Sequence, residues 1–299
     1  MDKKLTIKRI VIFTLLAIGL SAVWDIIFLY LPDGPTIYDD PENATPMSLF
    51  SGWDMMGPAI AAFLTHLITK EGMSGSMLKF NIKGNVKYYV LPYAALLCVS
   101  FINALFMPIV AGESFYFGND MREFLLLILD TAVSCVMLCG LYFGEEYGWR
   151  GYLYPKLEEL FGTGKALVLT GIIWGVWHTP CLLKGHIFGT DIPLFPVSNI
   201  LLMCVFCVFI TPVFVFFSKK TNSVWPAVLA HGFVNNFVSY ASLMFIDGEK
   251  TSLTAMQISS VFFIGYGVVG AFFFIVMVRQ GRLLVDRFDL IFPQLFMLC

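Results

Sequence analysis

Long apolar runs separated by short polar segments dominate this chain. A scan of its 299 residues for stretches of about 20 apolar residues, the length at which a helix spans a bilayer, predicts eight helices. Their expected ranges are 9–32, 50–69, 87–112, 122–155, 165–184, 196–218, 223–245 and 256–279. The pattern predicts an all-α, polytopic membrane protein, a bundle of about eight transmembrane helices in which residues 1–299 form one integral-membrane domain.

The fourth predicted helix is unusually long. No proline interrupts residues 122–154, so a continuous helix ending near Pro155 would measure about 50 Å. That length requires a strong tilt, a break, or an N-terminal part outside the bilayer. The sequence leaves these three alternatives open.

Composition and charge agree with a membrane protein. Hydrophobic residues make up 58% of the chain and charged residues 13%, with a mean hydropathy of +0.78, which exceeds what one soluble core could bury. With the N-terminus inside, fifteen of the 19 lysines and arginines fall in the predicted cytoplasmic segments. The sequence therefore predicts a multi-pass protein of the cell membrane with both termini cytoplasmic. We expect the lipid bilayer and no nucleic acid among its partners, although the net charge of −2 says nothing about nucleic acid.

Two adjacent carboxylates stand inside the fourth predicted helix. Glu146 and Arg150 are four residues apart, so they share a helix face and can form an ion pair. Glu145 is rotated by about 100° from Glu146 and has no such local partner. We therefore expect Glu146 to be structural and Glu145 to be free to act as a base.

Two further helices each carry a polar pair at the same spacing. Trp174 and His178 share one face of the fifth predicted helix, and His231 and Asn235 share one face of the seventh. At about 1.5 Å per residue, Glu145, His178 and His231 lie at depths of about 15, 20 and 16 Å from the cytoplasmic helix ends. This agreement predicts one buried site in a cavity that opens toward the cytoplasm.

Small residues recur at four-residue spacing beside this site. Gly140, Gly144 and Gly148 form one stripe, and Gly171 and Gly175 form another. Such stripes let helix backbones approach closely, so we expect tight packing at both.

The predicted site residues favour hydrolysis by an activated water. Glu145 could take a proton from water with help from His178, while His231 and Asn235 could donate hydrogen bonds to the oxyanion. This mechanism requires no cofactor. The alternative is a zinc ion bound by Glu145, His178 and His231, with one position left for water. The sequence does not decide between them.

In this order and spacing, the motifs resemble those of the CAAX protease and bacteriocin-processing (CPBP, or Abi) family of intramembrane proteases, in its bacterial branch. The resemblance is strongest over 145–236, and a family-like core extends over about 50–245. It implies that Glu145 and the motif histidines are catalytic, in an enzyme variously described as a metalloprotease or a metal-free glutamate protease. Where Trp174 stands, the family pattern often has phenylalanine.

Several functions remain open. The resemblance implies an endopeptidase acting on a membrane-associated peptide or protein in the lipid bilayer, near its C-terminus or leader. Prenylated CAAX peptides are the substrates of the eukaryotic branch, whereas the bacterial character here favours a leader peptide, a signalling propeptide or a membrane-protein tail. One alternative is a non-catalytic scaffold or bacteriocin-immunity protein of the same fold. Another is a proton-coupled transporter, since buried glutamate and histidine also form proton relays.

Overall fold

The computed structural model describes residues 2–30, 48–116, 121–238, 241, 243, 245–247 and 255–280. In these residues all regular secondary structure is helical, which confirms the predicted all-α class. The elements are α1 (Lys3–Tyr30), the 3₁₀ helix η2 (Ser48–Met56), α2 (Gly57–Ile68), α3 (Val86–Ala111), α4 (Met121–Met137), α5 (Cys139–Glu146), the π-helix η3 (Tyr147–Leu153), α6 (Tyr154–Phe161), α7 (Thr163–Trp177), α8 (Thr179–Leu182), α9 (Val197–Thr221), α10 (Trp225–Phe233), the π-helix η4 (Val234–Val238) and α12 (Ala255–Gln280).

Each of the eight predicted segments contains a helix, but the helices differ in length. By length and composition, four helices of the described chain could cross a membrane alone: Lys3–Ile27, Val86–Ala111, Val197–Thr221 and Gln257–Gln280. α2 has 12 residues and α7 has 15, so at about 1.5 Å per residue each is shorter than a hydrocarbon core of about 30 Å. α7 lies in the middle of the bundle beside α9, and α2 lies on its flank beside α1. Three of the 19 lysines and arginines counted for the orientation, Lys250, Arg282 and Arg287, lie outside the described residues. So do parts of the predicted helices 9–32 and 223–245.

The long fourth segment is broken. α4 ends at Met137 and α5 begins at Cys139, and the two parts bend by 65°. Of the three alternatives that the sequence allowed, the structure has the break. The second part continues through η3 into α6, where Pro155 occupies the first turn and has no N–H to lose there.

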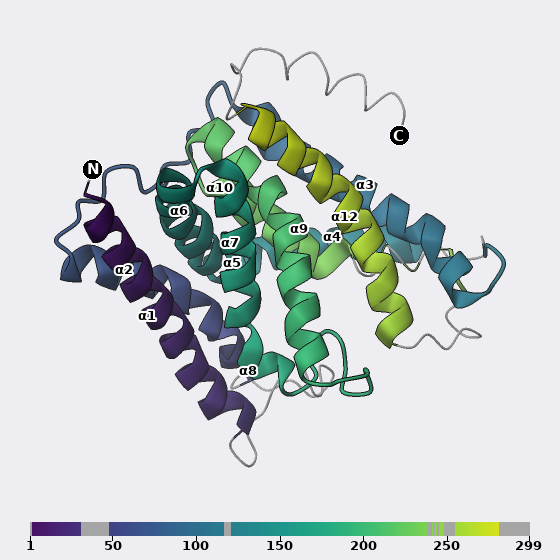
Figure 1. Cartoon of the computed structure of the whole chain (residues 1–299). Coiled ribbons are helices and arrows are strands. Elements are labelled where there is room, and N and C mark those ends of the chain that lie inside the picture. Colours follow the sequence, from purple (N-terminus) through teal and green to yellow (C-terminus); the bar gives the residue numbers. More distant parts are fainter. Residues whose placement is uncertain are drawn as a thin grey trace.

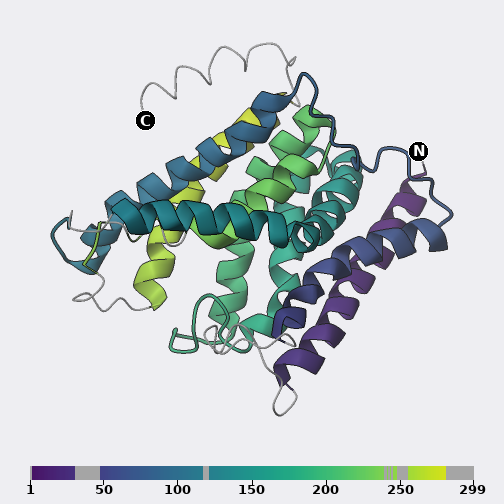
Figure 2. The ribbon, with the colours of Figure 1, turned by 180° about the vertical axis from the view of Figure 1, so that it is seen from behind.

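The helices form a bundle around α7 and α9, which run side by side through its middle (Figure 1). α1 and α2 pack together on one flank, and α12 lies against α3 and α9 on the other. α4 runs across the bundle at a steep angle to α9, as Figure 2 shows from behind. Its continuation, α5 and η3, passes between α2 and α10 and so carries the two glutamates into the interior.

Both predicted glycine stripes pack against neighbouring backbones. A Cβ at Gly144 would collide with the backbone of Met55 and Met56, and one at Gly148 with Pro58. On α7, a Cβ at Gly171 or Gly175 would collide with the α9 backbone. Gly140 is the exception, because nothing lies within 4 Å of the position of its Cβ. The close approach of α5, η3 and α7 to their neighbours thus depends on glycine.

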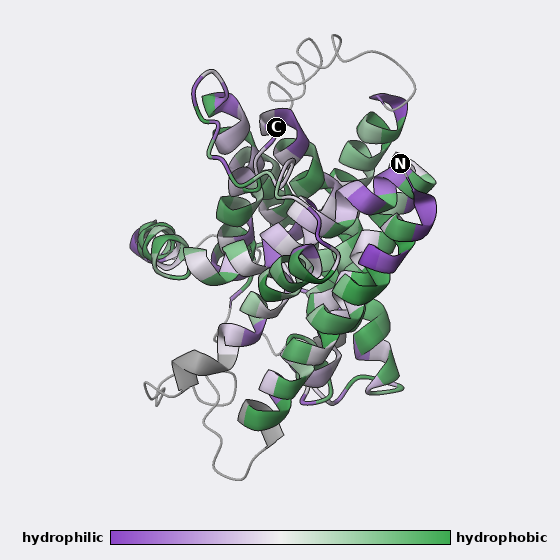
Figure 3. Ribbon diagram, turned by 90° about the vertical axis from the view of Figure 1, so that its left-hand side faces the viewer, coloured by the Kyte–Doolittle hydropathy of each residue, from purple (hydrophilic) through white to green (hydrophobic). Residues whose placement is uncertain are grey.

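Hydropathy follows the arrangement expected in a bilayer. Figure 3 shows hydrophobic residues along much of the helical bundle and polar residues gathered near the N-terminus. One polar cluster at that end centres on Glu71, which follows α2 and contacts Arg9 at 3.4 Å and Lys156 at 3.1 Å. Tyr152 donates a hydrogen bond to Glu71 over 3.0 Å, and His66 Nδ1 lies 3.6 Å away. This cluster joins α1, α2, η3 and α6.

Candidate active site

The two adjacent glutamates end α5, and the π-helix η3 follows them. Glu145 is 2% exposed, Glu146 0% and Arg150 1%, although all three are ionisable. Short π-helical turns are rare and occur often at functional sites, because they redirect side chains that a regular helix would stack. Aromatic side chains of η3 are buried as deeply as these three residues, among them Tyr147 and Trp149, which are both 0% exposed.

Glu146 forms the predicted ion pair and a second bond that the sequence did not predict. Arg150 Nη1 donates to Glu146 Oε1 over 3.0 Å, which confirms the expected pair. The same oxygen lies 2.7 Å from His231 Nδ1 on α10. Because this carboxylate oxygen accepts, Nδ1 carries the hydrogen in this pair, and a neutral His231 then has its lone pair on Nε2. Glu146 therefore sets the tautomer and orientation of His231.

Glu145 lies on the other side of the His231 ring. Its Oε1 is 3.9 Å from His231 Nε2. From the charges alone we expected Glu145 to have no local partner, but it has two neutral ones. Its Oε2 accepts the indole N–H of Trp174 over 2.5 Å and that of Trp149 over 3.4 Å. Trp149 is four residues from Glu145, so a search for neutral donors at helical spacing would have found it.

The His231 ring is enclosed by aromatic side chains. Tyr142 stacks on it with a centroid separation of 5.2 Å, and Trp174 and Phe214 lie 5.7 and 5.9 Å away. Arg150 lies over the rings of Trp174, at 4.0 Å, and Phe214, at 4.9 Å. One nitrogen of the guanidinium thus contacts Glu146, and the flat face of the guanidinium contacts the rings of Trp174 and Phe214. The Nε and Nη2 atoms of Arg150 and Oε2 of Glu146 find no hydrogen-bond partner in the described residues.

His178 lies next to this cluster without joining it. It directly follows the last residue of α7, and its Nδ1 donates to the carbonyl of Trp174 over 2.9 Å, which leaves Nε2 free. Its ring contacts Trp174 and Trp177 with centroid separations of 5.9 and 4.7 Å. Within the described residues, no hydrogen bond or ion pair links His178 to Glu145 or His231.

Asn235 and Asn236 have different surroundings. Asn235 is exposed, whereas Asn236 is half-buried and donates to the Tyr142 hydroxyl over 2.9 Å and to the Gly232 carbonyl over 2.7 Å. The cause is η4, which begins at Val234. In a π-helix the repeat is wider than 3.6 residues, so the residue five positions after His231 occupies the place expected for the fourth. The structure thus brings Asn236, through Tyr142, to His231.

The predicted zinc ligands do not form a metal site in this geometry. In the described part of the chain, no group of three histidine, cysteine, aspartate or glutamate side chains is placed to share a metal ion. Glu145 Oε1, His178 Nε2 and His231 Nε2 keep no hydrogen bond of their own in the described residues, so only the placement of the three side chains speaks against a shared ion. The side chains of Glu145, His178 and His231 are thus not grouped around one ion position in this geometry, and no chemical step is assigned to a metal.

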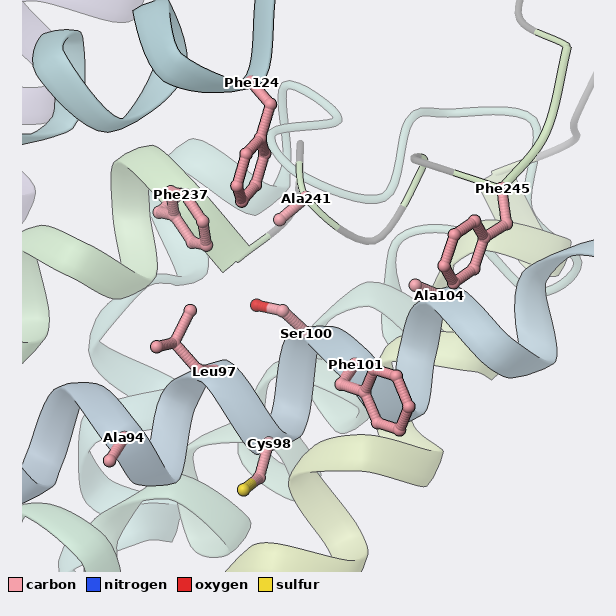
Figure 4. A pocket seen from close by; sticks show the side chains of 10 residues that line it. All are labelled: Ala94, Leu97, Cys98, Ser100, Phe101, Ala104, Phe124, Phe237, Ala241 and Phe245. Carbon is pink, nitrogen blue, oxygen red and sulfur yellow. The ribbon is translucent and has the colours of Figure 1, made fainter. Parts of the chain in front are cut away.

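An apolar pocket of about 400 Å³ lies elsewhere, between α3, α4 and η4. Figure 4 shows Phe124 and Phe237 on one side of it and Leu97 and Ser100 of α3 on the other. None of the predicted site residues lines it. Since it contains no ionisable group besides Cys98, this pocket is not the candidate active site.

Comparisons with known proteins match the part of the chain that carries this site. The family model described as Type II CAAX prenyl endopeptidase Rce1-like matches residues 124–237, from α4 to η4. A CAAX prenyl protease 2 of Methanococcus maripaludis is 32% identical over 78 residues, which are 26% of this chain and 25% of that protein. The matched part therefore spans about a quarter of the length of that relative. The family match contains every predicted site residue: Glu145, Glu146, Arg150, Trp174, His178, His231 and Asn235.

Proposed function

We propose that this chain, which belongs to the CAAX protease and bacteriocin-processing family through residues 124–237, is an intramembrane endopeptidase. The observation that carries the proposal is the pair formed by Glu145 Oε1 and His231 Nε2, 3.9 Å apart in a buried site. A carboxylate and an imidazole at this separation can both reach one water oxygen at hydrogen-bond distance. The pair is thus suited to activating water.

The proposed reaction is direct hydrolysis of a peptide bond. Glu145 Oε1 takes one proton from the water while the water oxygen bonds to the carbonyl carbon. The carbon–nitrogen bond then breaks, the proton held by Glu145 passes to the leaving nitrogen, and the other water hydrogen stays with the new carboxyl group. His231 keeps the water in place through Nε2, because its Nδ1 is held by Glu146.

His178 and Asn235 keep their predicted roles in this proposal. His178 has a free Nε2 with which to bind the water or the substrate, and Asn235 has an exposed carboxamide that can donate to the oxyanion. Both would make these contacts with substrate bound, since catalytic hydrogen bonds often tighten only in the complex. Glu146 and Arg150 support the site without touching the substrate.

We further propose that the substrate is a membrane-associated peptide or protein, cut near its C-terminus or leader on the cytoplasmic side. The placement of most lysines and arginines in the predicted cytoplasmic segments supports this orientation. The name of the relative refers to CAAX prenyl substrates, and a peptide with an apolar chain would suit a site that lies within the bilayer.

The experiment is mass spectrometry of peptide termini in membranes that contain the wild type or Glu145→Gln. We expect new termini with the wild type that are absent with Glu145→Gln, while both proteins accumulate equally in the membrane. If cells that carry Glu145→Ala or His231→Ala keep the phenotype that the wild-type protein gives them, the result would instead support the non-catalytic scaffold or immunity protein. Uncut peptide carried across reconstituted vesicles would support the transporter.

A further inference from the structure

Two indole N–H groups converge on one oxygen of Glu145. Trp174 on α7 reaches Oε2 over 2.5 Å and Trp149 on η3 reaches it over 3.4 Å. The contact of Trp174 is the closer of the two, and that of Trp149 is at the edge of hydrogen-bond range. Oε1 receives neither indole and lies on the side of His231. The two oxygens of this carboxylate therefore have different environments.

The ring of Trp174 is fixed by more than this hydrogen bond. The guanidinium of Arg150 lies 4.0 Å from its centroid, and Arg150 is itself bonded to Glu146. Trp174 is 3% exposed, so its ring has little freedom to turn. The indole N–H is thus a preorganised donor, which holds the Glu145 side chain in one rotamer at low entropic cost.

A neighbouring tryptophan shows that this bond is not a general feature of buried indoles in the bundle. Trp177 lies three residues further on, at the end of the same helix, and is also 3% exposed. Its indole N–H has no hydrogen-bond partner in the described residues. Both indoles pack against other rings, but Trp174 contacts Arg150 and His231, whereas Trp177 contacts Trp149 and His178. Only the N–H of Trp174 has an acceptor in the described residues, and phenylalanine could supply ring packing at either position.

We propose that Trp174 is a positioning residue that assigns separate roles to the two oxygens of Glu145. Its indole N–H holds Oε2, assisted by Trp149, and thereby directs Oε1 toward the water shared with His231. This inference rests on the proposed endopeptidase function, because it names the oxygen of Glu145 that takes the proton. It also predicts a hydrogen bond that can be measured without any substrate.

The first arm of the experiment compares cleavage by Trp174→Phe, Trp149→Phe and Trp177→Phe. We expect kcat of Trp174→Phe to fall by about tenfold to 100-fold, as the loss of a hydrogen bond to a charged group predicts, with KM unchanged. Trp149→Phe should lose less, because its bond is longer, and Trp177→Phe should keep the wild-type kcat. Equal kcat values for Trp174→Phe and Trp177→Phe, at equal thermal stability, would overturn the proposal.

The second arm records the indole N–H resonances of the chain's 6 tryptophans by nitrogen-15 NMR in detergent micelles, each of the three assigned from its phenylalanine variant. In the wild type, the Trp174 proton should lie furthest downfield of the three. Glu145→Gln should move the Trp174 resonance most, that of Trp149 less, and that of Trp177 not at all. An unmoved Trp174 resonance would refute the hydrogen bond. If the resonance moves but no substrate is cut, the endopeptidase function fails while the hydrogen bond stands.

Discussion

His231 Nδ1 lies 2.7 Å from Glu146 Oε1, and this contact joins the two halves of the site. The residues are 85 positions apart, on α10 and at the end of α5. Glu146 is at the same time bonded to Arg150, so the three side chains form a buried chain in which the histidine is held by an ion pair. The second glutamate of the motif is therefore as important to the geometry as the first.

From this relationship we predict that substitutions of the two neighbouring glutamates differ in their effect on stability and agree in their effect on cleavage. Glu146→Gln leaves the buried Arg150 without a charged partner, which typically costs about 3–5 kcal/mol. Glu145→Gln breaks no ion pair with a lysine or arginine and keeps an oxygen for the Trp174 N–H, so its stability should change by less than about 1 kcal/mol. Thermal unfolding in detergent measures both, and cleavage should be lost in each.

The comparison also provides its own control. If Glu145→Gln unfolds as early as Glu146→Gln, then the two carboxylates share the structural role and the division between them is wrong. If Glu146→Gln is as stable as the wild type, Arg150 does not depend on Glu146 for its charge compensation.

The cluster around Glu71 predicts a pH dependence of stability. Burial alone would raise the pKa of Glu71, but Lys156, Tyr152 and Arg9 outweigh it and hold this pKa below the ordinary value of 4.5. A carboxylate whose pKa is lowered by folding contributes stability above its unfolded pKa and loses it as the pH falls through the folded one. The contribution of Glu71 should therefore be complete at pH values well above 4.5 and be lost progressively as the pH falls from about 4.5 through the lower pKa of the folded state.

The measurement is thermal unfolding of the wild type and Glu71→Gln between pH 7 and pH 3. The variant should be less stable by roughly 1 kcal/mol at pH 7, because the ion pairs are only partly buried, and the two proteins should converge at low pH. Glu113→Gln is the matched control, since Glu113 is exposed in the loop after α3 and makes no side-chain contact in the described residues. A constant difference across the pH range would contradict the role of the Glu71 charge.

The sequence predicted those parts of the site that depend on local helical geometry. Glu146 and Arg150 are four residues apart in a helical segment, so their ion pair follows from the spacing alone. The bonds from His231 to Glu146 and from Trp174 to Glu145 connect residues 85 and 29 positions apart, and one sequence does not reveal which long-range partners meet. The 65° break after Met137 was also unpredictable in position, because neither proline nor a Gly/Ser pair marks it.

The π-helix η4 separates the roles of two adjacent asparagines. Asn236 donates to Tyr142, which stacks on His231, so Asn236→Ala removes two hydrogen bonds and should lower stability by about 1–2 kcal/mol. Asn235 is exposed and its side chain makes no hydrogen bond in the described residues, so Asn235→Ala should leave thermal unfolding unchanged. Because the proposed role of Asn235 is to donate a hydrogen bond to the oxyanion, the kcat of Asn235→Ala should nevertheless fall by roughly 100-fold or more. Unfolding in detergent and cleavage kinetics on both variants separate these effects. Wild-type kcat in Asn235→Ala would remove Asn235 from the mechanism, and an unchanged melting curve for Asn236→Ala would contradict its contact with Tyr142.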